Sequence, residues 1–279
     1  NKKKKPDLKN LIDATKIVSR NLKKGSIIVY ESTVFPGCTE EICLPLIEKI
    51  SNLKYNKDFY LAYSPERINP GKSKFKLKNT VKIVGSSNKK ILRYLKKIYQ
   101  NICLKVHPVI DIKTAEAAKI IENTQRDINI ALINEFSIIF KKMNLDINKI
   151  LEAANTKWNF IKFEPGLVGG HCIGVDPYYL TYKLEKMNYK PKMILAGRKI
   201  NDNMSKYVAK KILNDLKLTK PKKKKILILG ATFKENCSDL RNSKIFDTIK
   251  FLEKKGIKVY LFDPLVPIEE LKSFKGNIV

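Results

Sequence analysis

Short apolar runs and longer helical stretches alternate along the first 110 residues of the chain. Apolar residues recur at helical spacing over 8–22 and stop before Gly25, after which the apolar run 26–30 predicts a buried strand. The same patterns predict helices near 39–50 and 88–100, and strands at 58–63, 81–84 and 105–108. Strands that alternate with helices predict a mostly parallel α/β sheet.

Polar loops follow the first two predicted strands. Thr33 comes after the first strand, and Glu66 and Arg67 come after the second. Ligands of parallel α/β sheets bind where loops leave the carboxyl ends of the strands. We therefore expect both loops to face a ligand, although Glu66 and Arg67 also fit a plain surface ion pair.

The middle of the chain predicts one long helix. The pattern from 113 to about 143 has no Gly or Pro and runs for roughly 30 residues, against the usual 11 to 12. Such a helix is expected to link two domains. We also expect the protein to form a homodimer or higher homo-oligomer through this helix. Lys119 and Asn123 lie four positions apart on one face, where they can contact one ligand or simply be surface polar residues.

The second half of the chain predicts helices, one long loop and a single βαβ unit. Helical patterns cover 146–154 and 193–216, and the irregular, Gly-rich stretch 158–176 is too long for a mere connector. A strand at 225–230, a helix at 243–255 and a strand at 259–262 make one βαβ unit, which cannot bury both sheet faces. No G-x-G-x-x-G precedes the first strand. We therefore expect a fragment that is incomplete at both ends.

A cysteine lies among glycines in the loop Gly169-Gly170-His171-Cys172-Ile173-Gly174-Val175-Asp176. Glycines let a substrate approach the main chain, and a thiol there becomes a nucleophile if a neighbour lowers its pKa. A buried, inert cysteine in a turn explains the same pattern. The residues alone leave both interpretations open.

Composition excludes several classes of protein. The 279 residues are 43% hydrophobic, which is enough for a sizeable core. No run of about 18 apolar residues and no apolar leader occur, so we expect a cytoplasmic protein. Five cysteines without a CxxC pair argue against a disulfide framework and against a metal site.

The net charge is strongly positive. Lys and Arg number 56 against 27 Asp and Glu, a balance of +29. The lysines are spread along the chain, whereas nucleic-acid modules concentrate charge and interleave aromatic residues. We therefore expect no nucleic acid or membrane partner, and a positive surface that favours a small anionic substrate.

Separate motifs together resemble one family. They are Ser32-Thr33-Val34, Pro65-Glu66-Arg67, Lys119 with Asn123, the 169–176 loop, and Thr232-Phe233-Lys234 followed by Asp239-Leu240-Arg241. In this order, from about residue 6 to 263, they resemble the UDP-glucose/GDP-mannose dehydrogenase family. The sequences Trp158-Asn159-Phe160 and 165–180 most resemble those of the bacterial members that act on UDP-N-acetylglucosamine or UDP-N-acetylgalactosamine.

The resemblance implies a fold and an activity. The fold is α/β, with part of a Rossmann-like NAD domain at 1–110, a central helical domain at 111–216 and part of a Rossmann-like UDP-binding domain at 217–279. The activity is the NAD-dependent, four-electron oxidation of the C6 hydroxyl of a UDP-sugar to a uronate for surface polysaccharides, through a cysteine thioester. A UDP-glucose enzyme and an inactive fragment that serves as an interaction module are the alternatives.

The resemblance also assigns residues. Catalytic roles fall on Cys172, Lys119, Asp176, Glu66, Thr33 and Asn123. Thr33 and Arg241 are expected to contact NAD. Substrate contacts are implied for Glu66, Lys119, Asn123, Ile161, Lys162, Phe163, Gly169, Arg198 and Lys234.

Overall fold

The computed structural model describes residues 6–68, 76–170, 173–216, 224–272 and 277–278. The chain folds into two compact units. The first comprises Asn1–Asn123 with Asp176–Lys190, and the second comprises Thr124–Val175 with Pro191–Val279. The domain boundaries expected after residues 110 and 216 stay a prediction.

The first unit is built on a four-stranded sheet of order β1-β2-β3-β4. Its strands are Ser26–Tyr30, Phe59–Tyr63, Val81–Gly85 and Lys105–Val109. β1 runs parallel to β2, and β3 runs parallel to β4, while β2 and β3 meet antiparallel at the single pair Tyr63 and Gly85. All four strands were predicted, and the antiparallel contact at the centre of the sheet was not.

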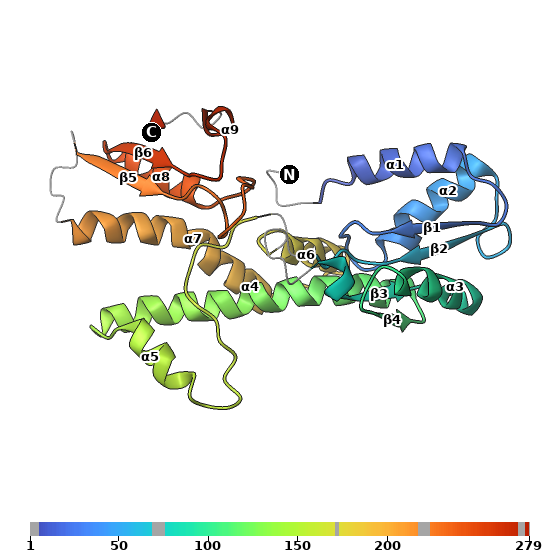
Figure 1. Ribbon diagram of the computed structural model, residues 1–279, viewed down its shortest axis with the longest axis horizontal. Helices are drawn as coiled ribbons and strands as arrows, with labels where there is room; N and C mark the ends of the chain where they lie inside the picture. The colour runs from blue at the N-terminus through green and yellow to red at the C-terminus, as the bar shows by residue number, and fades with distance from the viewer. Residues whose placement is uncertain (1–5, 69–75, 171–172, 217–223, 273–276, 279) are drawn as a thin grey trace. The chain divides into compact units, whose positions relative to one another are not determined.

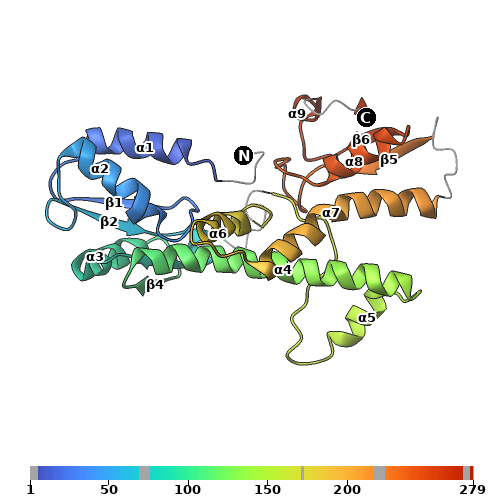
Figure 2. The ribbon, with the colours of Figure 1, turned by 180° about the vertical axis from the view of Figure 1, so that it is seen from behind.

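Helices cover both faces of this sheet. They are α1 (Lys9–Arg20), the π-helical turn η1 (Thr39–Cys43), α2 (Leu44–Ser51) and α3 (Lys89–Gln100), with a short 3-10 turn, η3 (Leu77–Asn79), before β3. Because side chains alternate along a strand, Leu61 packs toward α1 and α2, while its neighbour Ala62 packs toward Leu92 and Leu95 of α3. Figures 1 and 2 accordingly show α3 on the other side of the strands from α1.

Helix α4 spans Ile112–Lys142, 31 residues, which confirms the predicted long helix. Its first part belongs to the first unit and the rest to the second. Helix α6 (Asp176–Glu185) was not predicted, because Asp176-Pro177 reads as the start of a turn. Proline is equally at home in the first turn of a helix, where its missing N–H costs nothing.

The second unit contains α5 (Ile147–Ala154), α7 (Lys192–Asp215), α8 (Ile245–Lys254), α9 (Ile268–Lys272) and a parallel sheet of order β5-β6-β7. The strands are Lys225–Leu229, Lys258–Phe262 and Asn277–Ile278. Ile226 and Ile228 pack into the core with α7 and α8, whereas Leu227 and Leu229 are exposed. Among the described residues, helices therefore cover only one face of this sheet, as the single βαβ unit predicts. β7 and α9 were not predicted.

Membrane-spanning helices are not found in the ranges that the structure describes: no helix there is both long enough and apolar enough to cross a bilayer. The described cysteines are Cys38, Cys43, Cys103 and Cys237, and each is a free thiol.

Gly85→Ala tests how closely β3 approaches the start of α4. A Cβ at Gly85 would lie 2.6 Å from the carbonyl oxygen of Asp111 and 2.7 Å from Cβ of Ala115, so backbone must move. We expect a loss of about 1 to 3 kcal/mol in the free energy of unfolding in urea.

The matched control is Gly166→Ala, because a Cβ there meets nothing within 4 Å. Equal unfolding midpoints for the two variants would contradict the close approach.

Candidate functional site

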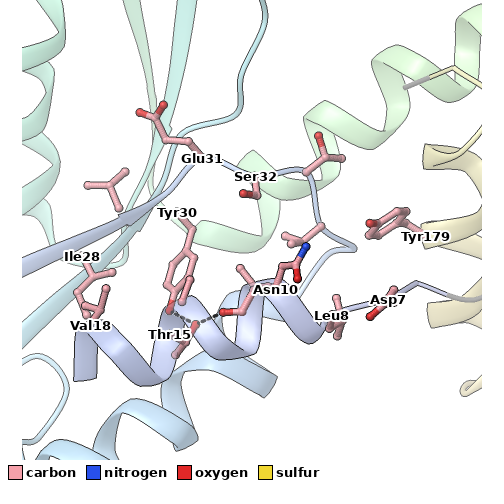
Figure 3. A pocket seen from close by; sticks show the side chains of 15 residues that line it. Asp7, Leu8, Asn10, Thr15, Val18, Ile28, Tyr30, Glu31, Ser32 and Tyr179 are labelled. Carbon is pink, nitrogen blue, oxygen red and sulfur yellow. Dashed lines mark hydrogen bonds between the residues drawn. The ribbon is translucent and has the colours of Figure 1, made fainter. Parts of the chain in front are cut away.

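A cavity of about 420 Å³ lies in the first unit, between α1 and the segment that follows β1. Figure 3 shows Thr15 and Tyr30 at one end, joined by a hydrogen bond of 2.9 Å, and Asn10 and Tyr179 toward the other. The lining residues are Asp7, Leu8, Asn10, Leu11, Ala14, Thr15, Val18, Ile28, Val29, Tyr30, Glu31, Ser32, Thr33, Val34 and Tyr179. Thr33, a predicted site residue, thus borders a space of ligand size.

The buried carboxylate of Glu116, on α4, holds the loop that carries Thr33. It accepts hydrogen bonds from the backbone N–H of Gly37 at 2.5 Å, from the N–H of Thr39 at 3.0 Å and from the Thr39 hydroxyl at 2.7 Å. Burial raises the pKa of Glu116, while these three donors lower it. Gly37 adopts φ +92°, where glycine is favoured.

Glu116 is not among the site residues predicted from the sequence. The only sequence signal is an acidic residue close to the start of a helix, which also suits a favourable contact with the helix dipole on the surface.

Three predicted catalytic side chains meet around Asp176. The amide nitrogen of Asn123 donates to the Asp176 carboxylate at 2.5 Å, and the charge of Lys119 acts on the same carboxylate. The Lys119 ammonium donates to the main-chain carbonyl of Glu66 at 2.6 Å. All three side chains are buried. The structure therefore assembles a buried carboxyl, an amide donor and an ammonium donor.

Asp176 titrates close to neutrality. Burial raises its pKa to about 6, although the hydrogen bond from Asn123 and the charge of Lys119 both lower it. A carboxyl with such a pKa can hold or release a proton near physiological pH, as a general acid or base does.

The side chain of Glu66 does not join this cluster. It is exposed, and its carboxylate accepts the backbone N–H of Ile68 at 2.5 Å. Arg67 does not pair with Glu66; it binds Glu122 at 2.7 Å and the carbonyl of Val81 at 2.7 Å. The simple surface pair is therefore not formed, and the predicted role of Glu66 as a base stays a prediction.

In the second unit, the glycine-rich segment is fixed by main-chain contacts. Asn134 of α4 binds Gly166 twice, donating to its carbonyl at 3.0 Å and accepting its N–H at 2.8 Å. Gly169 and Gly170 lie against Phe233: a Cβ on either would come within 2.9 Å of that side chain. Cys172, the predicted nucleophile, lies outside the described residues.

The other predicted substrate residues of this segment are on its surface. Ile161 is exposed, and Lys162 forms an exposed ion pair with Glu164 at 3.5 Å. Phe163 is half-buried.

Arg198 is buried between α4 and α7. It binds Asp127 at 2.6 Å and also pairs with Asp202. Burial raises the pKa of Asp127 and the Arg198 charge lowers it. Asn201 completes the network, binding Asp127 at 2.7 Å and Asn134 at 2.9 Å. In this structure Arg198 therefore joins two helices beneath the Gly166 clamp, and its contact with substrate stays a prediction.

Lys234 and Arg241 lie in the loop after β5. The Lys234 ammonium lies 5.7 Å from the ring centroid of Phe233. Arg241 is exposed and binds Asp239 through two nitrogens, at 2.8 and 2.6 Å. Asp263 shapes this loop by accepting the N–H of Ala231 at 2.7 Å.

Metal ligation has no support in the described ranges, where no group of three His, Cys, Asp or Glu side chains could hold an ion.

Models of one protein family match three parts of the chain. They are the NAD binding domain of the UDP-glucose/GDP-mannose dehydrogenase family at 1–103, its central domain at 113–203 and its UDP binding domain at 227–279.

Individual relatives cover nearly all of the chain. It is 51% identical to the UDP-N-acetyl-D-glucosamine 6-dehydrogenase of Salmonella typhi and 49% identical to that of Pseudomonas aeruginosa, over 99% and 96% of this chain. The solved structure of a UDP-D-ManNAc dehydrogenase from Pyrococcus horikoshii superposes with a TM-score of 0.86, at 32% identity over 95% of this chain. The chain spans 65%, 64% and 63% of these three proteins.

Glu116→Gln is expected to loosen the Thr33 loop. An amide offers one acceptor oxygen and turns an NH₂ toward a backbone N–H, so at least one buried donor loses its partner. We expect a loss of about 1 to 3 kcal/mol in unfolding free energy, measured in urea. The exposed Glu185→Gln is the matched control, and an equal response of the two variants would refute the anchor.

Asp176→Asn is expected to stabilise the fold above pH 6. The folded pKa of about 6 exceeds the ordinary value of 3.8, so the folded state binds the proton more tightly than the unfolded chain. Protonated Asp176 therefore stabilises the fold. This contribution to the free energy of unfolding is complete below the unfolded pKa of 3.8 and is lost as pH rises through the folded pKa of about 6. Because asparagine stays neutral, the variant should gain up to about 2 to 3 kcal/mol near pH 8 and little near pH 4.

Urea unfolding at several pH values measures this difference, with the exposed Asp215→Asn as control. A difference from wild type that does not change with pH would mean that Asp176 does not titrate in this range.

Proposed function

This chain belongs to the UDP-glucose/GDP-mannose dehydrogenase family, and from that premise we propose that its protein oxidises the C6 hydroxyl of a UDP-N-acetylhexosamine to a carboxylate, with NAD. The observation that carries the proposal is the identity of about half over nearly the whole chain with two UDP-N-acetyl-D-glucosamine 6-dehydrogenases. The product would be a uronate for surface polysaccharides.

The proposed reaction needs a nucleophile. Loss of a hydride and a proton converts the alcohol to an aldehyde, and the Cys172 thiolate then adds to the aldehyde carbon. A second hydride leaves this tetrahedral adduct and produces a thioester, which water hydrolyses to the carboxylate and the free thiol. NAD, when bound, supplies the acceptor for both hydrides, one molecule for each. The Cys172 assignment rests on the sequence.

Lys119, Asn123 and Asp176 would serve the oxyanion and the water. An ammonium and an amide N–H that are already buried and oriented can stabilise a developing oxyanion without reorganisation. Asp176, with a pKa of about 6, can take a proton from the hydrolytic water near neutral pH. Glu66 and a water held by Thr33 are proposed to assist in hydrolysis.

The cavity beside Thr33 suits part of a dinucleotide. Its lining includes Ser32 and Thr33, whose hydroxyls can bond ribose hydroxyls, and Val18 and Ile28 give it an apolar wall. We propose that Thr33 and, from the UDP-binding part, Arg241 contact NAD.

The remaining substrate contacts are proposed for Ile161, Lys162, Phe163, Gly169, Arg198 and Lys234. The lysines and the arginine supply positive charge for the diphosphate of a UDP-sugar.

We propose that the enzyme is a homodimer or higher homo-oligomer. Leu132, Phe136 and Ile139 are exposed along one side of α4, and Met143 continues the row. This spacing makes one apolar helix face, which a second copy would bury. The free thiols of the described cysteines agree with a cytoplasmic location.

Cys172→Ser tests the thioester in the full-length enzyme. We expect uronate formation from UDP-N-acetylglucosamine to fall by at least about a thousandfold, because serine is a far weaker nucleophile. Mass spectrometry of the product and NADH absorbance provide the measurement.

Cys103→Ser, at a thiol that packs in the core beside α3 and donates to the Tyr99 carbonyl, should keep the wild-type rate. Uronate formation by Cys172→Ser at the wild-type rate would rule out the thioester. If the wild-type enzyme turns over UDP-glucose faster than UDP-N-acetylglucosamine, the substrate is UDP-glucose instead.

A further inference from the structure

Positive charge is not evenly distributed along this sequence. Residues 67–110 contain ten Lys and two Arg but no Asp or Glu, although the whole chain has 27 acidic residues. Exposed charges interact over about 10 Å at moderate ionic strength, so a stretch without acidic residues produces a local field that its own sequence does not cancel.

The fold collects part of this charge on one helix. α3 turns Leu92 and Leu95 into the core of the first unit. Lys90, Arg93 and Lys97 follow helical spacing on the exposed side, with Lys89 beside them. None of these four cations makes an ion pair with a side chain in the part of the chain that the structure describes.

Apolar side chains border the cations. Tyr94 is 56% exposed and Ile98 is 43% exposed, one turn apart on the same face as Lys90 and Lys97. Ile102 and Leu104 follow directly after the helix, and Leu104 is 67% exposed. We call Lys89, Lys90, Arg93, Tyr94, Lys97, Ile98, Ile102 and Leu104 together the α3 surface.

We propose that the α3 surface docks on anionic phospholipid membranes. Lys and Arg near such a membrane are attracted by its negative surface potential. Tyr94 suits the headgroup region, where an aromatic ring with a polar end is favoured. Ile98, Ile102 and Leu104 can enter the acyl boundary and leave water.

A lipid surface explains the α3 surface better than nucleic acid does. Proteins that bind single strands stack bases on aromatic rings along a basic groove, whereas three of the four exposed apolar residues here are aliphatic. Isoleucine and leucine provide neither stacking nor hydrogen bonds to bases. The chemistry of the α3 surface therefore favours a membrane as its partner. This proposal departs from the expectation of no membrane partner, which assumed an even spread of lysines.

Vesicle binding by the full 279-residue chain tests the proposal. Vesicles of phosphatidylcholine with roughly 30% phosphatidylserine are sedimented with the protein in about 0.1 M salt. Lys90→Gln/Arg93→Gln/Lys97→Gln is expected to lower the partition coefficient on the order of a hundredfold. Each of the three cations contributes about 1 kcal/mol of attraction to the anionic surface, and the variant loses all three contributions.

The matched control removes equal charge from α7. Lys206, Lys210 and Lys211 are exposed there, and Lys206→Gln/Lys210→Gln/Lys211→Gln should bind nearly as wild type. Equal losses in the two triple variants would mean that only net charge matters and would overturn the proposal. Circular dichroism and thermal unfolding establish that both variants are folded.

A second variant separates lipid from other anions. Tyr94→Ser/Ile98→Ser should lower vesicle binding roughly fivefold, with little dependence on salt, because it removes apolar contact and no charge. Binding to a single-stranded oligonucleotide that is tighter than vesicle binding and unaffected by this variant would favour nucleic acid and overturn the proposal. Release from vesicles by millimolar inorganic phosphate would likewise overturn it, in favour of a free-anion site.

Discussion

A row of buried polar side chains on α4 is the constraint on which the rest of the site depends. Glu116, Lys119, Asn123, Asp127 and Asn134 are spaced so that they follow one side of the helix. Each is bonded to a segment far away in sequence. Because an unpaired buried polar group costs several times what a hydrogen bond contributes, these partners must be in place when the core forms. Within each unit, α4 therefore fixes the loops that are bonded to it.

These polar contacts also explain the electrostatics of the site. Burial raises the pKa of Glu116, Asp127 and Asp176 alike. Their surroundings then differ: Glu116 has three donors, Asp127 has the full charge of Arg198, and Asp176 has one amide and a more distant ammonium. Asp176 is the least compensated of the three. The charged form of Asp176 lowers the stability of the fold, so stability alone does not explain this carboxyl. Such groups are typical of chemical sites, which supports the proposed role of Asp176 in proton transfer.

Local patterns predicted the elements well and the tertiary contacts poorly. The strand at 26–30 and the 31-residue α4 follow from apolar periodicity, and the pairing of Lys119 with Asn123 on one face follows from their spacing. Asp176 was placed near them by family resemblance, since a gap of 53 positions from Asn123 has no periodic signal. The Asn134 clamp on Gly166 was missed for the same reason, because either residue alone reads as ordinary helix or loop.

The charge of α3 shows why a total over the chain conceals what individual faces do. On α7, Asp202 and Asp215 lie among the lysines, and Asp202 pairs with the buried Arg198. On α3 the core takes Leu92 and Leu95, with Ile91 and Tyr99 packed beside them, so folding leaves the opposite face free to take any polar residue. Stability then provides no reason for a face that lacks acidic residues and still exposes Tyr94 and Ile98. Acidic residues would relieve repulsion among neighbouring cations, so their absence favours a negatively charged partner that does so instead.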